Sequence, residues 1–409
     1  KLQGNFPVVP VYDMKIKEDD LVVGTHGRSF WILDDLTPLR ELAGQSSGTE
    51  TDISGIRFFP PRTTYRRTLN WSVNLFLGDG KNYSPDFGLP GTHYQETTPD
   101  GEKRFRHLDM GENPPEGVIV NYFIESEANL TPEKPLELIV LDANGAEIER
   151  FSTKKTDEKS DKSESEESEP SDEKASLTAK VGFNRFVWNM RYPGPEVKID
   201  KTLEKPGYKQ LGRISPFGGD TSGGPAAPPG NYQVQLKTGD AEFIHSFEII
   251  KDPRLNTSPE DFSAQFELWI KIRNRVSDVN SAINRIRRIK LQITELLARE
   301  NFNNSAEEKS FGEIQKAAEA LREKFNTFEN ELTQNQYETP SDRLRHPTML
   351  KQRMEALVSV VAVADAAPPQ QAYSVFEHLS ALIDQRLAEL SELEEQEVVR
   401  LNQQIDQAG

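Results

Sequence analysis

The stretch DLVVGTHGRSFWIL, residues 20–33, says more about the fold than any other part of this 409-residue chain. Two short runs, residues 21–25 and 29–33, are rich in β-branched and aromatic side chains, and His26, Gly27 and Arg28 separate them. Because glycine adopts positive φ freely, this pattern predicts a hairpin with a tight turn. Residues 11–16 predict a third strand before it. Three short antiparallel strands leave two edges unpaired and make no core, so we expect this segment to complete a larger sheet assembly.

Residues 20–39, which extend this stretch, resemble the last blade of secreted bacterial proteins with sortilin/VPS10-type β-propellers built from BNR repeats. Many proteins of that group are labelled glycosyl hydrolases. Three later motifs resemble the same family in the same order: GFNRFVWNMRYPG at 182–194, APPGNY at 227–232 and KDPR at 251–254. The resemblance covers most of the chain thinly. It implies that the chain is the C-terminal part of such a protein, with nearly all of the propeller upstream.

The same resemblance sets our expectations for location and partners. It implies a secreted, periplasmic or cell-surface protein whose signal peptide lies upstream of Lys1, the first residue here. It also implies that residues 1–45, the last portion of a blade, contact an upstream propeller segment of the same protein or of another chain. An extracellular protein or a glycan is a further possible partner.

Residues 55–255 predict an all-β domain. Short runs of strand-forming residues with frequent turn signals and no helical periodicity are typical of an immunoglobulin- or fibronectin-like β-sandwich. Residues 152–177 interrupt it with nine acidic residues, five lysines and seven serines. Because such a segment buries too little apolar surface to offset its ordering entropy, we expect a disordered insertion there.

Residues 258–409 predict an antiparallel four-helix bundle. Ser258, Pro259 and two following acidic residues form a helix start, and apolar residues then recur at steps of three, four and seven up to Leu296. Further helices are expected near residues 306–333, 347–366 and 372–407, with short connections. The predicted class is therefore multidomain β plus α: the end of a β-propeller, then a β-sandwich, then a helical bundle.

Composition excludes several functional classes. The formal net charge of −17 argues against a general nucleic-acid partner, which requires a basic surface. The chain has no cysteine, and its six histidines are far apart, so we expect no metal site and no cofactor. No window approaches the roughly 20 apolar residues that span a bilayer, so no membrane span is predicted.

The candidate binding residues lie mainly in and beside the predicted hairpin: His26, Arg28, Trp31, Asp34 and Trp71. His26 and Arg28 either face the end surface of a propeller or stabilise their turn. Asp34 and its neighbour Asp35, close to Trp31, resemble a carboxylate pair beside a sugar-stacking ring. Adjacent strand residues point to opposite faces, however, which favours a turn or cap role for one of the two.

Two other groups have alternative interpretations. Trp71 belongs to a Gly- and Pro-rich stretch, predicted as loops, whose aromatic residues either line a carbohydrate or peptide groove or cover the sandwich edge; the others are Phe76, Tyr83, Phe87 and Tyr94. The first long helix carries a basic run of Lys271, Arg273, Arg275, Arg285, Arg287, Arg288 and Lys290. These charges either bind an acidic partner or form a solvated face that pairs with acids on neighbouring helices, and the second interpretation is favoured because the helical region is net acidic.

Two functions remain as alternatives. The first is a non-catalytic binding, interaction and stabilising region attached to a secreted propeller. The second is part of a glycoside hydrolase whose catalytic carboxylates lie in upstream blades. No residue of this chain matches a catalytic motif, so we assign no catalytic residue and favour the first function.

Overall fold

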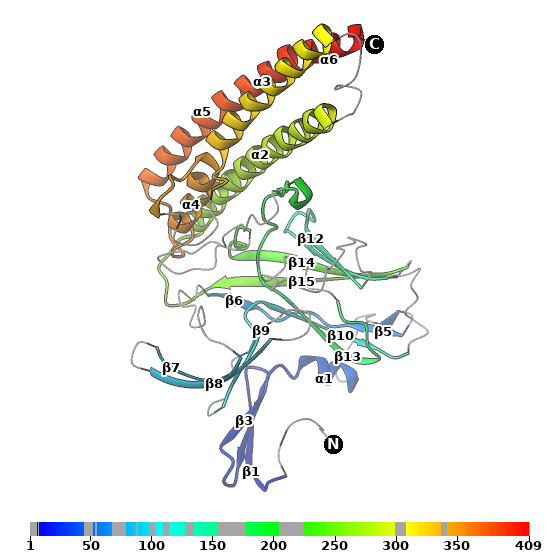
Figure 1. The fold of residues 1–409 in the computed structure, drawn as a ribbon. Coiled ribbons are helices and arrows are strands. Elements are labelled where there is room, and N and C mark those ends of the chain that lie inside the picture. The colour runs from blue at the N-terminus through cyan, green and yellow to red at the C-terminus, as the bar shows by residue number, and fades with distance from the viewer. Residues whose placement is uncertain are drawn as a thin grey trace. The chain divides into compact units, whose positions relative to one another are not determined.

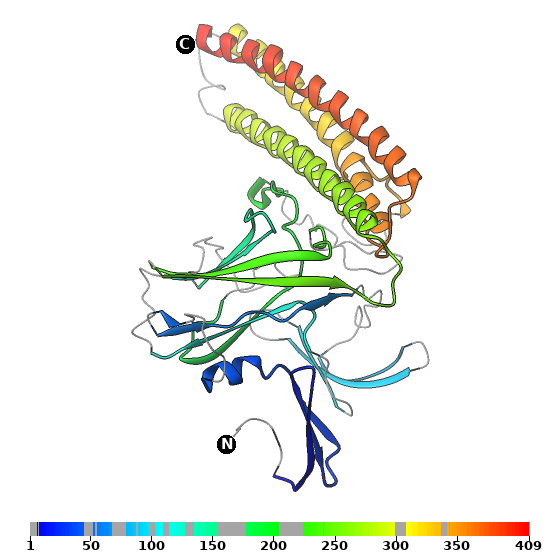
Figure 2. The same cartoon turned by 180° about the vertical axis from the view of Figure 1, so that it is seen from behind.

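The computed structural model describes residues 6, 8–44, 52–53, 55–67, 79–86, 89–97, 103–108, 114–126, 135–153, 177–203, 224–239, 241–298, 308–336, 342 and 344–408. These residues form a mixed β and α protein with several sheets and a C-terminal helical region, which confirms the predicted class at that level (Figures 1 and 2). The chain divides into two compact units. The first comprises Lys1–Arg66, Val73–Met190 and Pro229–Asp252, and the second comprises Arg67–Ser72, Arg191–Pro228 and Pro253–Gly409.

Two small sheets belong to the first unit. The N-terminal sheet has the order β1-β2-β3, with β1 at Val11–Lys17, β2 at Asp20–Thr25 and β3 at Phe30–Leu33. All three strands are antiparallel, as predicted. The other small sheet has the order β7-β8-β9, with strands at Gly80–Asp86, Leu89–Thr97 and Lys103–His107.

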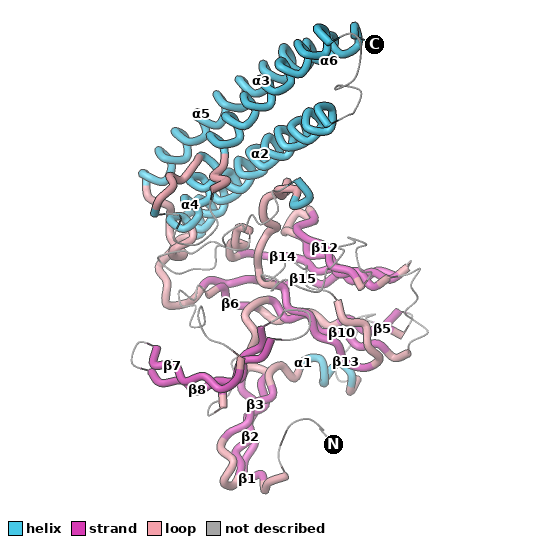
Figure 3. The backbone as a smooth tube through the Cα atoms, in the orientation of Figure 1, coloured by secondary structure: helices cyan, strands magenta, loops and turns pink. Residues whose placement is uncertain are grey.

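Two larger sheets supply most of the core of this unit (Figure 3). The four-stranded sheet has the order β13-β10-β5-β4, and the five-stranded sheet the order β12-β11-β14-β15-β6. Their strands are β4 Asp52–Ile53, β5 Ile56–Phe58, β6 Thr64–Arg66, β10 Val118–Ile124, β11 Leu136–Leu141, β12 Glu147–Ser152, β13 Gly182–Trp188, β14 Gly230–Thr238 and β15 Ala241–Lys251.

Aromatic side chains join the two larger sheets face to face. The Trp188 ring on β13 lies 6.0 Å from that of Tyr232 on β14, and Phe186 lies 4.6 Å from Phe151 on β12. On β10, Val118, Val120, Tyr122 and Ile124 are all buried, because alternate residues of a strand point to one face. This alternation is what places the core between the sheets.

The acidic insertion and the aromatic stretch are described in part. Residues 154–176 lie outside the described residues, whereas Ser152 ends β12 and Leu177 is buried. The predicted loop region around residues 71–94 contains strands β7 and β8, so the loop prediction is wrong for Tyr83 and Tyr94. Pro85 pairs with Pro90 next to the turn of this hairpin, a position at the strand ends where proline is tolerated.

Helices form most of the second unit. They are α2 Pro259–Ala298, α3 Glu308–Leu332, α4 Leu350–Val361, α5 Gln370–Leu393 and α6 Val399–Ala408, while α1 Thr37–Leu42 belongs to the first unit. A single turn of π-helix, Glu394–Val398, separates α5 from α6 where one uninterrupted helix was predicted. A short 3₁₀ turn, η2, covers Lys201–Leu203.

The start of α2 is as its sequence predicts. Ser258 Oγ accepts a hydrogen bond from the Asp261 backbone N–H at 3.2 Å, and an Asp261 carboxylate oxygen accepts one from the Ser258 N–H at 3.2 Å. This reciprocal pair is a capping box. Beyond it, the apolar stripe of α2 packs against α3, α4 and α5 around fully buried residues such as Ile283 and Phe325.

Candidate docking surface

The register of the N-terminal sheet places large apolar side chains on both of its faces. Met14 lies opposite Val23, which lies opposite Trp31, so these three side chains share one face. Val22 lies opposite Ile32, and their side chains share the other face. Because neighbours along a strand alternate, the all-apolar strand β3 contributes to both faces.

Much of this apolar surface is exposed to solvent. The exposed fractions are 75% for Phe30, 72% for Tyr12, 61% for Met14, and 59% each for Ile16 and Ile32. Large apolar side chains exposed together on one small sheet are typical of interaction sites in soluble proteins. Strand β3 is apolar on both faces, as in sheets that are covered on both sides, whereas β1 alternates and places Asp13, Lys15 and Lys17 on the face of Ile32. The chain therefore presents a sheet suited to being covered on two faces.

The predicted binding residues of the turn lie together at one end of this sheet. His26 and Arg28 are exposed, and the His26 ring lies 5.0 Å from the Tyr12 ring. Trp31 donates its indole N–H to the Arg28 carbonyl at 3.0 Å and is partly covered by Phe6, whose ring lies 5.4 Å away. Gly27 has φ +74°, as the tight turn requires. Trp71 lies outside the described residues.

The opposite end of the sheet is held by a charged cluster. Asp20 accepts a hydrogen bond from Arg62 at 2.7 Å and another from the Asp35 backbone N–H at 2.9 Å. Arg62 also donates to the Glu18 carbonyl at 2.7 Å, and Asp19 forms an ion pair with Arg40 in the last turn of α1. Arg62 precedes β6 of the five-stranded sheet, so this cluster attaches the base of the N-terminal sheet to a distant part of the same unit.

Of the two neighbouring aspartates, Asp35 has a turn role in the structure. Asp35 has φ +60° and accepts a hydrogen bond from the Thr37 backbone N–H at 3.0 Å, which is a turn role at the start of α1. Burial raises the pKa of Asp34, and the nearby Asp20 carboxylate raises that pKa further. Arg185 and Arg62 oppose the increase in the pKa of Asp34 without cancelling it. The preference for a turn role of one of the two residues is confirmed.

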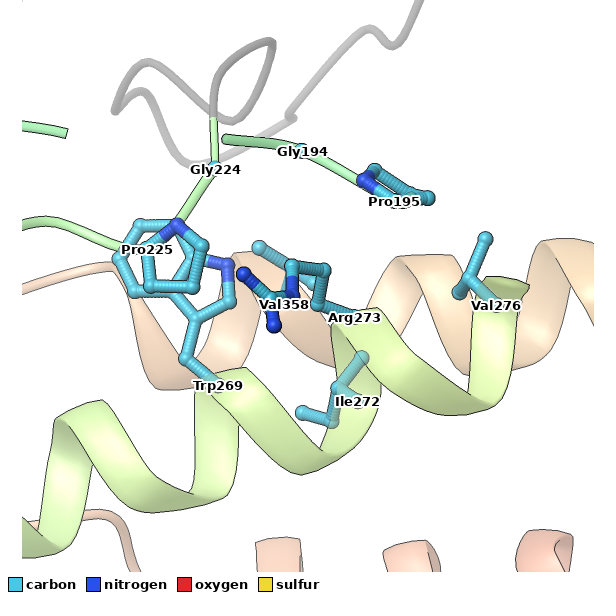
Figure 4. A pocket seen from close by; sticks show the side chains of 9 residues that line it. All are labelled: Gly194, Pro195, Gly224, Pro225, Trp269, Ile272, Arg273, Val276 and Val358. Carbon is cyan, nitrogen blue, oxygen red and sulfur yellow. The ribbon is translucent and has the colours of Figure 1, made fainter. Parts of the chain in front are cut away.

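A recess in the second unit is too small to be a ligand site. Gly194, Pro195 and Pro225 lie over Trp269 and Arg273 of α2 and enclose a cavity of about 20 Å³ (Figure 4). That volume suits a single water molecule. The recess is a packing feature of the segment that precedes the second unit's helices.

The basic run on α2 is largely paired within the helical unit. Arg275 binds Asp384 on α5 at 2.6 Å, and Arg287 and Lys290 each bind Glu329 on α3 at 2.7 Å. The favoured interpretation, pairing with acids on neighbouring helices, is confirmed for these residues. Arg287 is only 10% exposed, so the solvated position predicted for it is wrong; Glu329, which is 5% exposed, faces it from α3.

Metal-binding clusters and membrane-spanning helices were sought among the residues that the structure describes. Within the described ranges, no group of three or more His, Cys, Asp or Glu side chains is arranged to hold a metal ion. No helix of the described part of the chain is both long and apolar enough to cross a membrane.

Comparisons with protein-family models, with curated proteins and with solved structures give no match.

Proposed function

We propose that this chain is the non-catalytic C-terminal interaction and stabilising region of a secreted sortilin/VPS10-like propeller protein, and that the N-terminal sheet docks onto the propeller. The observation that carries the proposal is the exposure of Met14 and Ile16 on one face of the sheet and of Phe30 and Ile32 on the other. Blades of a propeller are sheets packed around a central channel, so each is covered by its neighbours on both faces.

The proposal extends to the architecture of the whole chain. Residues 1–45 are the last portion of a blade, residues 55–255 an immunoglobulin- or fibronectin-like sandwich, and residues 258–409 an antiparallel four-helix bundle. The face-to-face packing of the two larger sheets supports the sandwich. The packing of α2 against α3, α4 and α5 supports the bundle. A secreted, periplasmic or cell-surface location follows from the same family resemblance.

The free energy gained on docking can be calculated for each buried side chain. Full burial of a large aliphatic side chain contributes about 1.5–3 kcal/mol, so Ile32, with more than half of its surface still exposed, contributes about 1–2 kcal/mol. A lysine at this position both forfeits that gain and buries a charge without a partner. The loss on substitution should therefore exceed tenfold in affinity.

The experiment compares substitutions on the two faces with a matched control in the same unit. Met14→Lys and Ile32→Lys each change one face, and Ile244→Lys changes an exposed isoleucine of β15 in the five-stranded sheet. Binding of the segment encoded directly upstream of Lys1 is measured by titration calorimetry. We expect both sheet variants to bind at least tenfold more weakly and the control to bind as the wild type does. Equal affinity for all four proteins, or an upstream segment without propeller repeats, would contradict the proposal.

A further inference from the structure

A polar stripe runs along one face of α2. It consists of Arg273, Ser277, Asn280, Asn284 and Arg288, spaced by four, three, four and four residues, which places all five on one side of the helix. The three central residues are buried although they are polar. Buried polar groups need hydrogen-bond partners, so the partners of this stripe show what it binds.

The partners belong to the main chain of residues 193–200. Asn280 donates its amide to the Val197 carbonyl at 2.8 Å. Asn284 donates to the Lys198 carbonyl at 2.8 Å and accepts from the Asp200 backbone N–H at 2.9 Å. Asn284 thus binds both a carbonyl and an N–H of this segment, as the backbone of a neighbouring strand would.

Longer contacts to the same segment involve the two ends of the stripe and Ser277. Arg273 donates to the Pro193 carbonyl at 3.4 Å, and Arg288 lies 3.8 Å from the Asp200 carboxylate. Ser277 Oγ lies 3.4 Å from the Val197 backbone nitrogen, which donates to it. The segment therefore follows α2 in the same direction from one end of the stripe to the other.

The stripe and the segment stay in step where the hydrogen bonds form. Seven residues of α-helix from Ser277 to Asn284 rise about 10 Å. Over this rise the stripe binds main-chain groups of Val197, Lys198 and Asp200 in chain order. The next position of the stripe is Leu291, which offers no hydrogen bond, so the stripe ends there.

The two residues directly before this segment, together with Pro195 within it, cover apolar residues of α2. The Arg191 guanidinium lies 5.7 Å from the centre of the Trp269 ring, and the Tyr192 ring lies 4.7 Å from that of Phe266. Pro195 lines the recess that contains Trp269 (Figure 4). Residues 191–195 thus cover the helix surface beside the polar stripe.

We infer that this face of α2 is a binding site for the main chain of a peptide, and that residues 193–200, the strap, are the ligand that occupies it within the same chain. The site binds main-chain groups, and Arg288 favours an acidic residue at the peptide position that it faces. Asn280 Oδ1 has no hydrogen-bond partner among the described residues. Because one polar group stays unsatisfied, the strap opens more easily than a fully bonded strand.

The test uses the absence of cysteine in this chain. Ile199→Cys places one thiol in the strap, at a partly buried position that packs against the helical core. The rate of thiol labelling then measures strap opening in the full chain. This thiol is combined with Asn280→Ala, with Asn284→Ala, with both, and with Gln292→Ala as a control at an exposed position of the same helix.

Since the double variant loses three hydrogen bonds, we expect its labelling to be at least about tenfold faster. Each single variant should fall between it and the control, and the control should label as the parent does. Circular dichroism at 222 nm checks that the helices remain folded. Equal labelling in the double variant and the control would overturn the inference, because the strap would then be held by its chain connections alone. Loss of helical signal in both single variants would also overturn it, since the two residues would then serve the fold of α2 itself.

Discussion

Reversing the charge of Arg287 should strongly destabilise the helical unit. Its guanidinium donates to one carboxylate oxygen of Glu329 at 2.7 Å, and Lys290 donates to the other at 2.7 Å. The exposed fractions of the Arg287 and Glu329 side chains are 10% and 5%. Arg287→Glu would place two carboxylates against each other in this buried position, with Lys290 as the remaining partner between them.

The magnitude follows from charge separation and burial. Two like charges about 4 Å apart repel by roughly 4 kcal/mol at an effective dielectric constant near 20. Removing one partner of a buried pair costs about 3–5 kcal/mol, and Lys290 offsets part of the total. We therefore expect Arg287→Glu to lower the free energy of unfolding by about 3–5 kcal/mol. At roughly 2–4 °C per kcal/mol for a unit of this size, Tm should fall by about 10 °C.

The neighbouring Arg288 provides the matched control. Its side chain is 62% exposed and lies 3.8 Å from Asp200, so Arg288→Glu should change the free energy of unfolding by less than about 0.5 kcal/mol. Thermal unfolding of both variants is followed by circular dichroism at 222 nm. A Tm for Arg287→Glu within about 2 °C of that for Arg288→Glu would refute the buried arrangement of Glu329.

Further changes test other parts of the structure. Burial would raise the pKa of Glu329, but the hydrogen bonds from Lys290 and Arg287 outweigh burial and hold that pKa below its usual value. The ionised carboxylate therefore stabilises the fold above the unfolded-state pKa, and this stabilisation is lost as pH falls through the folded-state pKa. Glu329→Gln should lose less stability than the wild type when unfolding is measured at decreasing pH. Burial lowers the pKa of His245, which is hydrogen-bonded to the Phe58 carbonyl, so the neutral ring is favoured in the folded state. The free energy of unfolding should therefore fall as pH drops below about 6.5, and it should fall less in His245→Asn. Gly224→Ala should unfold at a clearly lower temperature than the wild type, because an added Cβ would lie 1.9 Å from the Tyr192 carbonyl oxygen. Trp269→Ala should cost roughly 3–5 kcal/mol in chemical denaturation, since the ring is almost fully buried.

Local patterns in the sequence were sufficient to predict several of the secondary-structure elements. The hairpin around Gly27 and the start of α2 at Ser258 each depend on residues within a few positions of one another, and both have the predicted form. The strands β7 and β8 were missed because Pro85 and Pro90 resemble loop residues. They are tolerated here because they pair close to the hairpin turn.

Features that depend on distant residues were not predictable in this way. Arg62 binds Asp20 from 42 residues away, and Glu329 faces Arg287 from another helix, so neither contact leaves a local pattern. The stripe of α2 is an intermediate case. Ser277, Asn280 and Asn284 interrupt an apolar helix at regular steps, a signal in the sequence for a buried polar contact, but its partner at residues 193–200 could not be inferred from it.

The central claim is that the N-terminal sheet is covered on both faces by an upstream propeller segment, and amide hydrogen exchange of residues 11–33 tests it most directly. The chain is measured alone and together with the segment encoded upstream of Lys1. Because β1 and β3 each have an unpaired edge within the described sheet, we expect rapid exchange in the isolated chain. Adding the upstream segment should slow exchange in both edge strands by at least tenfold. Full protection of residues 11–33 in the isolated monomer, or exchange unchanged by the upstream segment, would contradict the claim.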